Sequence, residues 1–309
     1  MNSTSRHRFF RTSQGEVPHN WGHDPADFEP ERIDQVMPTL RQIFGPGRYF
    51  DVHVDGFDNL PEAPALLVSN HSGGTIIPDV WGLMFAWYEH FGHERPLHAL
   101  AHDMVFKLPP VARFFARGGV LRASRDQARR VLTDSQRDLL VMPGGERDTW
   151  RTWNQRYKVH FAGRKGYART ALECGVPIVP IANSGAHQTL IVLADGHRLA
   201  RKLGLQKIAR AEVWPVHLSL PWGLGVGPLP HFPTPTYLRY RIGAPILPPI
   251  PVEPGTTPSQ AAIDAYDQVV RDSMQELLDQ LRRDRPRLDE RIRRRVTGIR
   301  DRLRHSESH

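Results

Sequence analysis

Short apolar runs alternate with amphipathic stretches along most of the chain. Runs of two to five apolar residues bounded by glycine, proline or polar residues predict buried strands. These lie at 65–68, 97–101, 120–121, 139–142 and 178–182. Two further segments alternate between apolar and polar residues, at 49–54 and at 237–242, and we expect the second to close the sheet as an edge strand.

Helical spacing of apolar residues fills the intervals between these strands. Helices are predicted at 29–44, 79–92, 110–117, 125–135 and 163–174. Buried strands that alternate with helices are typical of an α/β protein whose helices cover both faces of the sheet. The pattern therefore predicts a mixed, largely parallel sheet flanked by helices.

The pattern changes after a proline-rich segment from Pro245 to Pro254. Residues 259–281 carry an apolar stripe at helical spacing, and after Pro286 the residues from 288 to 303 keep that spacing among many arginines. We therefore divide the chain into an N-terminal arm and helix (1–46), one central domain (47–255) and a C-terminal helical extension (256–309).

Charge is concentrated at the C-terminal end. Of the net charge of +8, residues 279–305 contribute +6, from eleven arginines against five acidic residues. The rest of the chain is nearly neutral, which does not favour a folded surface that binds a nucleic-acid backbone. Three interpretations of the basic amphipathic helix stay open: a membrane-surface anchor, a terminal helix packed on the body, and a nucleic-acid arm.

No apolar run is long enough to span a bilayer. The segment from Val213 to Phe232 is apolar and contains Trp214 and Trp222, but prolines and glycines interrupt it, so we expect irregular structure there. Such a composition suits a membrane interface or the wall of an apolar tunnel, and equally a buried loop.

His71 is the first candidate for chemistry. It follows the predicted strand at 65–68, and ligands of open α/β sheets bind at the carboxyl ends of strands. Asp79 follows where a helix is predicted to begin, and could either favour that helix terminus or accept the imidazole N–H. If the loop between them folds back, His71 becomes a general base and Asp79 its orienter.

Other familiar sites are not indicated. Cys174 is the only cysteine and lies in an apolar stretch, so a packing role is expected, and no disulfide can form within the chain. His93, His98 and His102 do not have the spacing of a zinc helix, and no metal or cofactor is predicted. The first twenty residues have no continuous apolar stretch of the secretory kind, so we expect a reducing, cytoplasmic location.

Four blocks follow one another along the chain: His71 with Asp79, then Gly119-Val120-Leu121-Arg122, then Pro143-Gly144-Gly145-Glu146-Arg147, then Val176-Pro177-Ile178-Val179-Pro180. In this order they resemble the glycerolipid acyltransferase superfamily, over roughly residues 48–246. The first block departs from that family, which usually has four residues between His and Asp where this chain has seven. The Pro-Gly-Gly of the third block, with Arg164-Lys165-Gly166 after it, is most similar to the bacterial relatives of the mono- and diacylglycerol acyltransferases.

The resemblance implies one acyltransferase domain, plus an N-terminal helix and C-terminal basic amphipathic helices. It implies transfer of a fatty acyl group from acyl-CoA or acyl carrier protein to a glycerolipid hydroxyl, in lipid metabolism that includes phospholipid biosynthesis. His71 would be the base and Asp79 its orienter. The substrate-binding residues it implies are Arg122 or Arg125, Gly144, Gly145, Glu146, Arg147, Arg164 and Lys165.

We expect the protein to be peripheral on the inner face of the cell membrane, held by the apolar segment 213–232 and the basic C-terminal helix. Two alternatives to the neutral glyceride acceptor stay open. One is lysophosphatidate or another lysophospholipid as acceptor. The other is a catalytically silent lipid-binding protein, which the lengthened interval between His71 and Asp79 would favour.

Overall fold

The computed structural model describes residues 20–202, 204, 212–250, 252–253 and 256–285. The predicted basic helix at 288–303 and most of the N-terminal arm lie outside this part of the chain.

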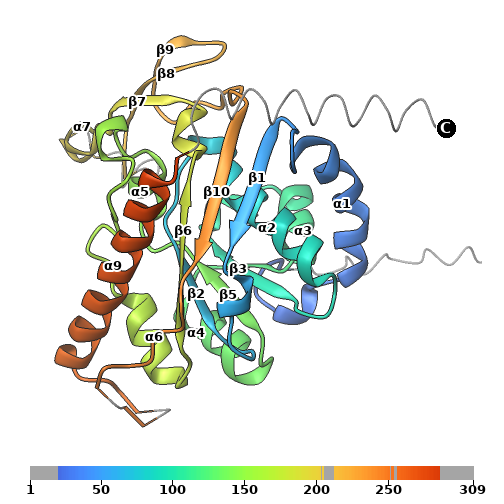
Figure 1. Cartoon of the computed structure of the whole chain (residues 1–309), viewed down its shortest axis with the longest axis vertical. Coiled ribbons are helices and arrows are strands. Elements are labelled where there is room, and N and C mark those ends of the chain that lie inside the picture. Colours follow the sequence, from blue (N-terminus) through green and yellow to red (C-terminus); the bar gives the residue numbers. More distant parts are fainter. Residues whose placement is uncertain (1–19, 203, 205–211, 251, 254–255, 286–309) are drawn as a thin grey trace, which may run out of the picture.

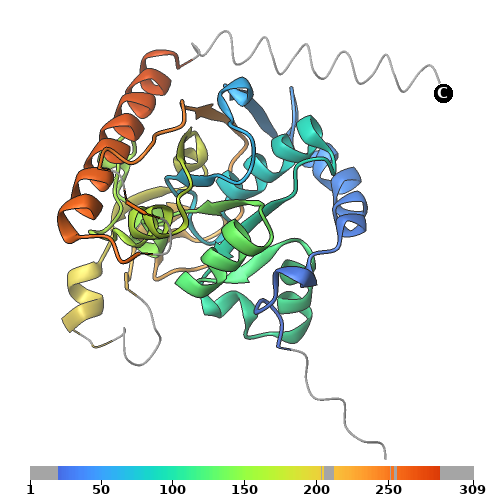
Figure 2. The ribbon, with the colours of Figure 1, turned by 90° about the horizontal axis from the view of Figure 1, so that it is seen from below.

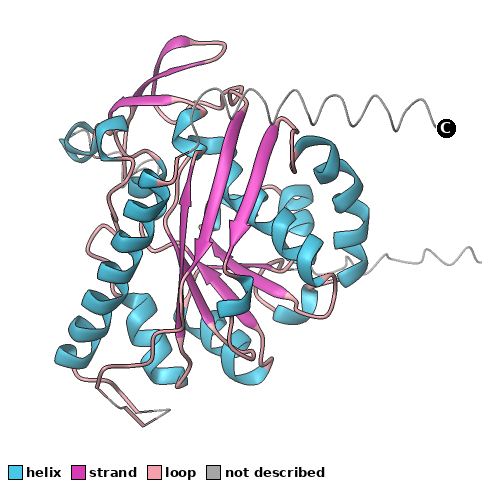
Figure 3. Ribbon diagram, in the orientation of Figure 1, coloured by secondary structure: helices cyan, strands magenta, loops and turns pink. Residues whose placement is uncertain are grey.

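A seven-stranded sheet forms the centre of the molecule (Figure 3). Its strands, in spatial order, are β1 (Phe50–Asp55), β10 (Thr236–Ile242), β6 (Ile178–Ser184), β2 (Leu66–Ser69), β5 (Asp138–Val141), β3 (Leu97–Ala101) and β4 (Val120–Arg122). The five strands from β6 to β4 are parallel, whereas β10 pairs antiparallel with β6 and parallel with β1. The predicted mixed, largely parallel sheet is confirmed.

Helices cover both faces of this sheet (Figure 1). One layer contains α1 (Pro30–Ile43), α2 (Pro78–Phe91) and α3 (Pro109–Arg117); the other contains α4 (Arg125–Arg129), α6 (Gly166–Cys174) and α9 (Gln260–Arg283). A π-helical turn over Arg130–Asp134 continues α4. Figure 2 shows α1 and α9 on opposite sides of the molecule.

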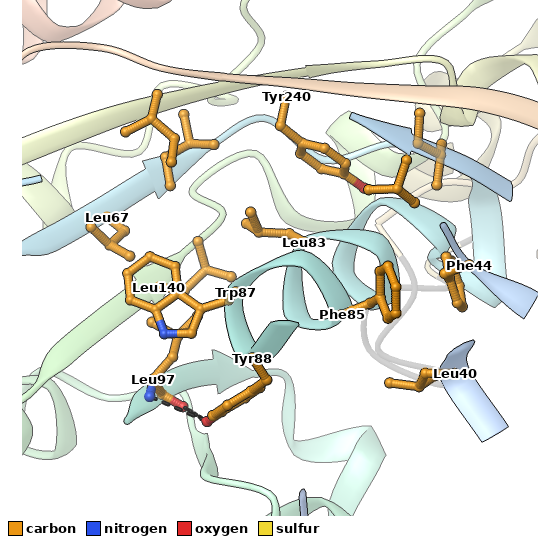
Figure 4. Close-up of a cluster of buried hydrophobic side chains, with 14 of the residues drawn as sticks. Leu40, Phe44, Leu67, Leu83, Phe85, Trp87, Tyr88, Leu97, Leu140 and Tyr240 are labelled. Atoms are coloured by element: carbon orange, nitrogen blue, oxygen red, sulfur yellow. Dashed lines mark hydrogen bonds between the residues drawn. The ribbon is translucent and has the colours of Figure 1, made fainter. Parts of the chain in front are cut away.

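The two cores follow from the alternation of side chains along the strands. Leu67 of β2 and Leu140 of β5 point into the core beneath α1 and α2, where Leu83, Trp87 and Tyr240 also pack (Figure 4). Their neighbours Leu66, Val68 and Leu139 point into the other core, beneath α4, α6 and α9. Because helices cover both faces of the sheet, consecutive residues of the central strands are apolar in the sequence.

The position of β10 corrects one prediction. We expected this strand at the edge of the sheet, but it lies between β1 and β6, and the edges are β1 and β4. Its alternating pattern reports that one face is more deeply buried than the other, with Leu238 and Tyr240 buried. The pattern carries no information on lateral neighbours, because every strand of a sheet presents two faces.

The structure of residues 213–232 corrects a second prediction. It is not irregular but contains β8 (Val216–Ser219) and β9 (Gly223–Val226), which form a three-stranded antiparallel sheet with β7 (Ile191–Ala194). This small sheet projects from the top of the molecule in Figure 1, with α7 (His197–Lys202) beside it. The pattern hid the strands because glycine occupies positions 223 and 225, and because exposed positions of this sheet are apolar as well.

Candidate active site

The loop after β2 folds back on itself. Gly73, Gly74 and Ile77 have positive φ angles of 99°, 66° and 46°, and a 3-10 turn spans Gly74–Ile76 before α2 begins at Pro78. A Cβ at Gly73 would lie 2.6 Å from Cδ of Pro78, so glycine is required for this close approach. The reversal returns the first turn of α2 to the carboxyl end of β2.

This reversal brings together the two residues that were predicted to work as a pair. His71 Nδ1 lies 2.8 Å from Asp79 Oδ2, despite the seven intervening residues. The imidazole is 15% exposed, whereas the carboxylate has no exposed surface. One ring nitrogen is thus committed to a buried carboxylate, which leaves Nε2 as the nitrogen that can take a proton.

Asp79 is held on all sides. Oδ2 also accepts a hydrogen bond from the Ser72 N–H at 2.7 Å, and Oδ1 accepts one from the Val80 N–H at 2.9 Å. The hydroxyl of Tyr240, from β10, donates to the Asp79 carbonyl oxygen at 2.7 Å. The residue therefore serves the helix terminus and the imidazole together, and the two interpretations left open by the sequence are compatible.

The electrostatics at His71 favour a protonatable base. Burial disfavours the imidazolium, but attraction by the Asp79 carboxylate and its hydrogen bond outweigh this and raise the pKa of His71 above its usual value. Asp148 adds to this effect, while Arg151 opposes it. A raised pKa means that the imidazole is a stronger proton acceptor than a free histidine side chain.

Asp148 is a residue of this site that sequence reasoning missed. It lies in α5 (Gly145–Thr149), directly after the Pro143–Arg147 block, and its Oδ2 accepts a hydrogen bond from the His71 backbone N–H at 2.6 Å. Burial raises the pKa of Asp148 to about 6, although Arg151 opposes the shift. Its place next to the block was the available signal.

Arg151 and His187 complete this buried network. Arg151 is 1% exposed and forms an ion pair with Asp148 through Nη1, while its Nη2 lies 3.4 Å from Nε2 of His187. Burial, and then Arg151, lower the pKa of His187 well below its usual value, so its neutral ring can accept from the guanidinium. The residues that directly follow the third sequence block thereby hold the backbone of the histidine loop.

A second network ties the histidine loop to β6. The Asn183 N–H donates to Asn70 Oδ1 at 2.8 Å, and Asn70 Nδ2 donates to the Asn183 carbonyl at 3.0 Å. The Ser72 hydroxyl donates to Asn183 Oδ1 at 3.2 Å and is buried. Ser72 is thus engaged as a structural donor beside His71.

The Pro-Gly-Gly turn is clamped by its own neighbours. Arg164 Nη1 donates to the carbonyl oxygens of Pro143 and Gly144 at 2.9 and 2.8 Å, and its Nη2 bonds both carboxylate oxygens of Glu212. Glu146 accepts from the Glu212 N–H at 2.8 Å, and burial raises its pKa. A Cβ at Gly144 would lie 2.4 Å from the His160 carbonyl oxygen, so this glycine allows close packing.

The remaining predicted binding residues lie in different surroundings. Arg122 donates to the carbonyl oxygens of Trp21 and Phe106 and packs over the Phe106 ring, at the end of edge strand β4. Lys165 bonds Asp264 of α9 at 2.8 Å, and Arg125 is exposed at the start of α4. With three strand spacings between β2 and β4, Arg122 lies roughly 14 Å from the histidine loop.

Arg147, at the end of the Pro-Gly-Gly block, has a buried side-chain donor. Its Nε is buried and, within the described part of the chain, has no hydrogen-bond acceptor. Its guanidinium lowers the pKa of His160, after burial, and contributes to lowering that of Asp195. A buried donor of this kind can bind an anionic or carbonyl oxygen of a ligand.

The histidines that were considered for a metal site have separate surroundings. His98 is buried and bonds the Gly119 carbonyl at 3.1 Å, and burial, with Arg137, lowers its pKa to about 4. His93 is exposed and bonds Asp34 at 2.9 Å. Among the described residues, no group of three or more histidine, cysteine or acidic side chains could hold a metal ion.

The order of the blocks and the geometry at His71 agree with the similarity of this chain to known proteins. The family model described as Acyltransferase matches residues 51–184, which include His71, Asp79 and the Pro-Gly-Gly block. The chain belongs to the acyltransferase family. An uncharacterized protein of Mycobacterium tuberculosis is 31% identical over 263 residues, which cover 84% of this chain and 66% of that protein.

Vertebrate relatives of this chain have a more descriptive name. The "DGAT1/2-independent enzyme synthesizing storage lipids" of Gallus gallus is 29% identical over 154 residues, covering 50% of this chain and 44% of that protein. Its Bos taurus counterpart is 26% identical over 235 residues, covering 76% and 60%. The chain thus spans less than two thirds of these relatives, and their name describes those proteins.

Proposed function

We propose that this protein moves a fatty acyl group from a thioester, acyl-CoA or acyl carrier protein, to a hydroxyl of a glycerolipid. The single observation that carries the proposal is the 2.8 Å contact between His71 Nδ1 and a fully buried Asp79, at the carboxyl edge of a parallel sheet. That arrangement is a general base with its orienting carboxylate.

The reaction requires one proton to move twice. As the acceptor hydroxyl oxygen bonds to the thioester carbonyl carbon, its proton passes to Nε2 of His71. The tetrahedral intermediate then expels the thiolate, which takes the proton back from the imidazolium, so the products are an ester and a free thiol. General-base assistance of this kind contributes about 10²- to 10⁴-fold in rate.

The negative oxygen of the intermediate needs donors. The His71 and Ser72 N–H groups are committed to Asp148 and Asp79, so we assign this role to the backbone of Gly73 and Gly74, which follow in the same loop. Arg147, with its buried Nε, is our candidate for a phosphate or carbonyl oxygen of the donor.

A neutral mono- or diglyceride is the acceptor that we favour. Arg164 is bonded to Glu212 and to the Pro-Gly-Gly turn, and Lys165 is bonded to Asp264, so neither is free for an acceptor phosphate. The storage-lipid name of the vertebrate relatives supports the same acceptor class. The alternative of a silent lipid-binding protein rested on the long His–Asp interval, which does not separate the two side chains.

Release of free thiol from acyl-CoA is the direct test. Wild-type protein is offered long-chain acyl-CoA with monoglyceride, diglyceride or lysophosphatidate, and product esters are separated by chromatography. We expect ester formation with a neutral glyceride, and a loss of about 10²-fold or more in His71→Ala. Preference for lysophosphatidate would overturn the acceptor assignment, and no ester with any acceptor would support the silent protein.

His93→Ala is the matched control for this variant. His93 also bonds an aspartate, Asp34, but it is exposed and lies outside the site, so its loss should leave the rate unchanged. Undiminished transfer in His71→Ala would end the general-base assignment.

A further inference from the structure

The small sheet of β7, β8 and β9 has two unlike faces. On the inner face, Val192 and His217 are buried, and the His217 ring lies 5.2 Å from that of Trp150. Gly225 completes this face, where a Cβ would come within 2.5 Å of the His217 ring. The inner face is thus fully packed against the body that carries Asp148.

The outer face is apolar and exposed. Leu218 pairs with Ile191 on one side and Leu224 on the other, and Val216 pairs with Val226. Leu224 and Val226 are 62% and 52% exposed. The turn and the return segment add Leu220, Trp222 and Phe232, of which Phe232 is 69% exposed.

None of the three strands contains a charged residue. Exposed antiparallel strands normally carry polar side chains on the solvent side, and edge strands commonly carry charges that prevent aggregation. A contiguous apolar face that lacks such polar and charged side chains indicates an interaction site.

A basic helix flanks this apolar face. Two residues after β7, α7 places Arg198, Arg201 and Lys202 in solvent, next to the exposed Leu199. Apolar side chains bordered by exposed cations are complementary to a bilayer surface with anionic headgroups. An exposed tryptophan such as Trp222 is typical of the membrane interface.

The same sheet reaches the histidine loop. Thr75 Oγ1 donates to the Pro228 carbonyl at 3.2 Å, and a Cβ at Gly74 would lie 3.0 Å from Cε1 of His231. The segment that returns from β9 therefore contacts the residues three and four positions after His71. A bilayer seated on the outer face would lie close to the entrance of the site.

We propose that the outer face of the β7–β8–β9 sheet, together with α7, docks on a lipid bilayer that contains anionic headgroups. This extends the proposed function, because it states how a water-insoluble acceptor and the histidine loop come together. Binding to the bilayer itself does not depend on catalysis.

Vesicle flotation of the full-length protein tests the proposal. The probes are vesicles of phosphatidylcholine alone and of phosphatidylcholine with phosphatidylglycerol, at low and high salt. We expect Leu218→Asp/Leu224→Asp to reduce the bound fraction more than about tenfold on both vesicles and at both salt levels, since two apolar side chains lose their burial. High salt screens the arginines of residues 286–309, which isolates the apolar contribution.

The matched control is Leu247→Asp/Ile250→Asp. These side chains are 70% and 43% exposed and follow β10, at the end of the main sheet where β6 begins. We expect this variant to float as the wild type does. A third variant, with Arg198, Arg201 and Lys202 changed to Gln, should lose the preference for phosphatidylglycerol at low salt relative to the wild type.

Unchanged flotation of Leu218→Asp/Leu224→Asp would overturn the proposal. If the same variant also loses a wild-type dimer in sedimentation, the face is an interface between two copies. Thiol release with detergent-dispersed glyceride separates this proposal from the proposed function: a wild type that floats but releases no thiol contradicts only the latter.

Discussion

The hydrogen bond between His71 and Asp79 determines how the base should respond to pH. In the proposed mechanism His71 accepts a proton only when it is unprotonated, so the rate should rise as pH passes upward through its pKa. Asp79 raises that pKa, and its negative charge would also stabilise the imidazolium that the proposed attack forms. Both the pKa of His71 and the stability of its imidazolium therefore depend on the contact with Asp79.

We predict that Asp79→Asn lowers kcat by about 10²- to 10⁴-fold and moves the acidic limb of the pH profile to lower pH. The shift has this sign because the variant removes the charge that favours the imidazolium. The measurement is kcat as a function of pH. Asp103→Asn is the control, since Asp103 lies beside Arg122 and not beside His71; an unmoved acidic limb in Asp79→Asn would show that the partner lies elsewhere.

Asp148 acts through the backbone rather than on the substrate. We predict that Asp148→Asn costs about 3–5 kcal/mol of unfolding free energy, because it leaves the buried Arg151 guanidinium without its counter-charge. Urea unfolding measures this. Asp126→Asn removes an exposed partner of Arg129 and should change stability by less than about 0.5 kcal/mol.

At the scale of elements, the contact between α2 and β10 positions Asp79. Gly82 lies one turn after Asp79 on α2, and a Cβ there would come within 2.5 Å of the Tyr240 hydroxyl. That hydroxyl is the donor to the Asp79 carbonyl. The glycine lets the helix approach the strand closely enough for this bond.

We predict that Gly82→Ala lowers stability by about 1–3 kcal/mol through overpacking, although alanine favours helix more than glycine. It should also lower the rate of thiol release, because Tyr240 must move. Gly166→Ala is the matched control: Gly166 begins α6 with no atom within 4 Å of its Cβ position. Equal stability of the two variants would show that Tyr240 yields without cost.

At the scale of the whole molecule, α9 is part of the central fold. Its Leu277, Leu278 and Leu281 pack with Ala182 of β6, and Tyr266 donates to the Ile246 carbonyl. The segment after the proline-rich break thus covers one face of the main sheet. Stability should depend on it.

Leu278→Ala tests this dependence. Leu278 is fully buried, so we predict a loss of about 2–5 kcal/mol of unfolding free energy, seen as a lower denaturant midpoint. Val269→Ala, at a position 41% exposed on the same helix, should leave the midpoint nearly unchanged. A small effect of Leu278→Ala would mean that the helix detaches without disturbing the sheet.

No helix among the described residues is both long and apolar enough to cross a membrane. Within the described residues, the small sheet exposes an apolar face that includes Leu218, Leu224 and Val226. The basic helix predicted at 288–303 stays a prediction, because it lies outside those residues.

Local patterns in the sequence were sufficient to predict the strands of the main sheet and the position of His71 at the end of one of them. Apolar runs such as 65–68 and 178–182 can be satisfied only by burial on both faces, and the histidine follows such a run directly. The strands β8 and β9 were hidden, because His217 and Gly225 occupy the inner face while Leu218 and Leu224 are exposed, which reverses the usual burial of apolar positions.

Only the tertiary structure decided which distant residues meet. Spacing along the chain could not establish that Asp79 reaches His71, because the reversal depends on three residues with positive φ. Nor could it show that Asp148 holds the His71 backbone, or that β10 lies inside the sheet, since both depend on lateral contacts between segments far apart in the sequence. Sequence patterns report the burial of each residue, whereas the identity of its neighbours is a property of the folded chain.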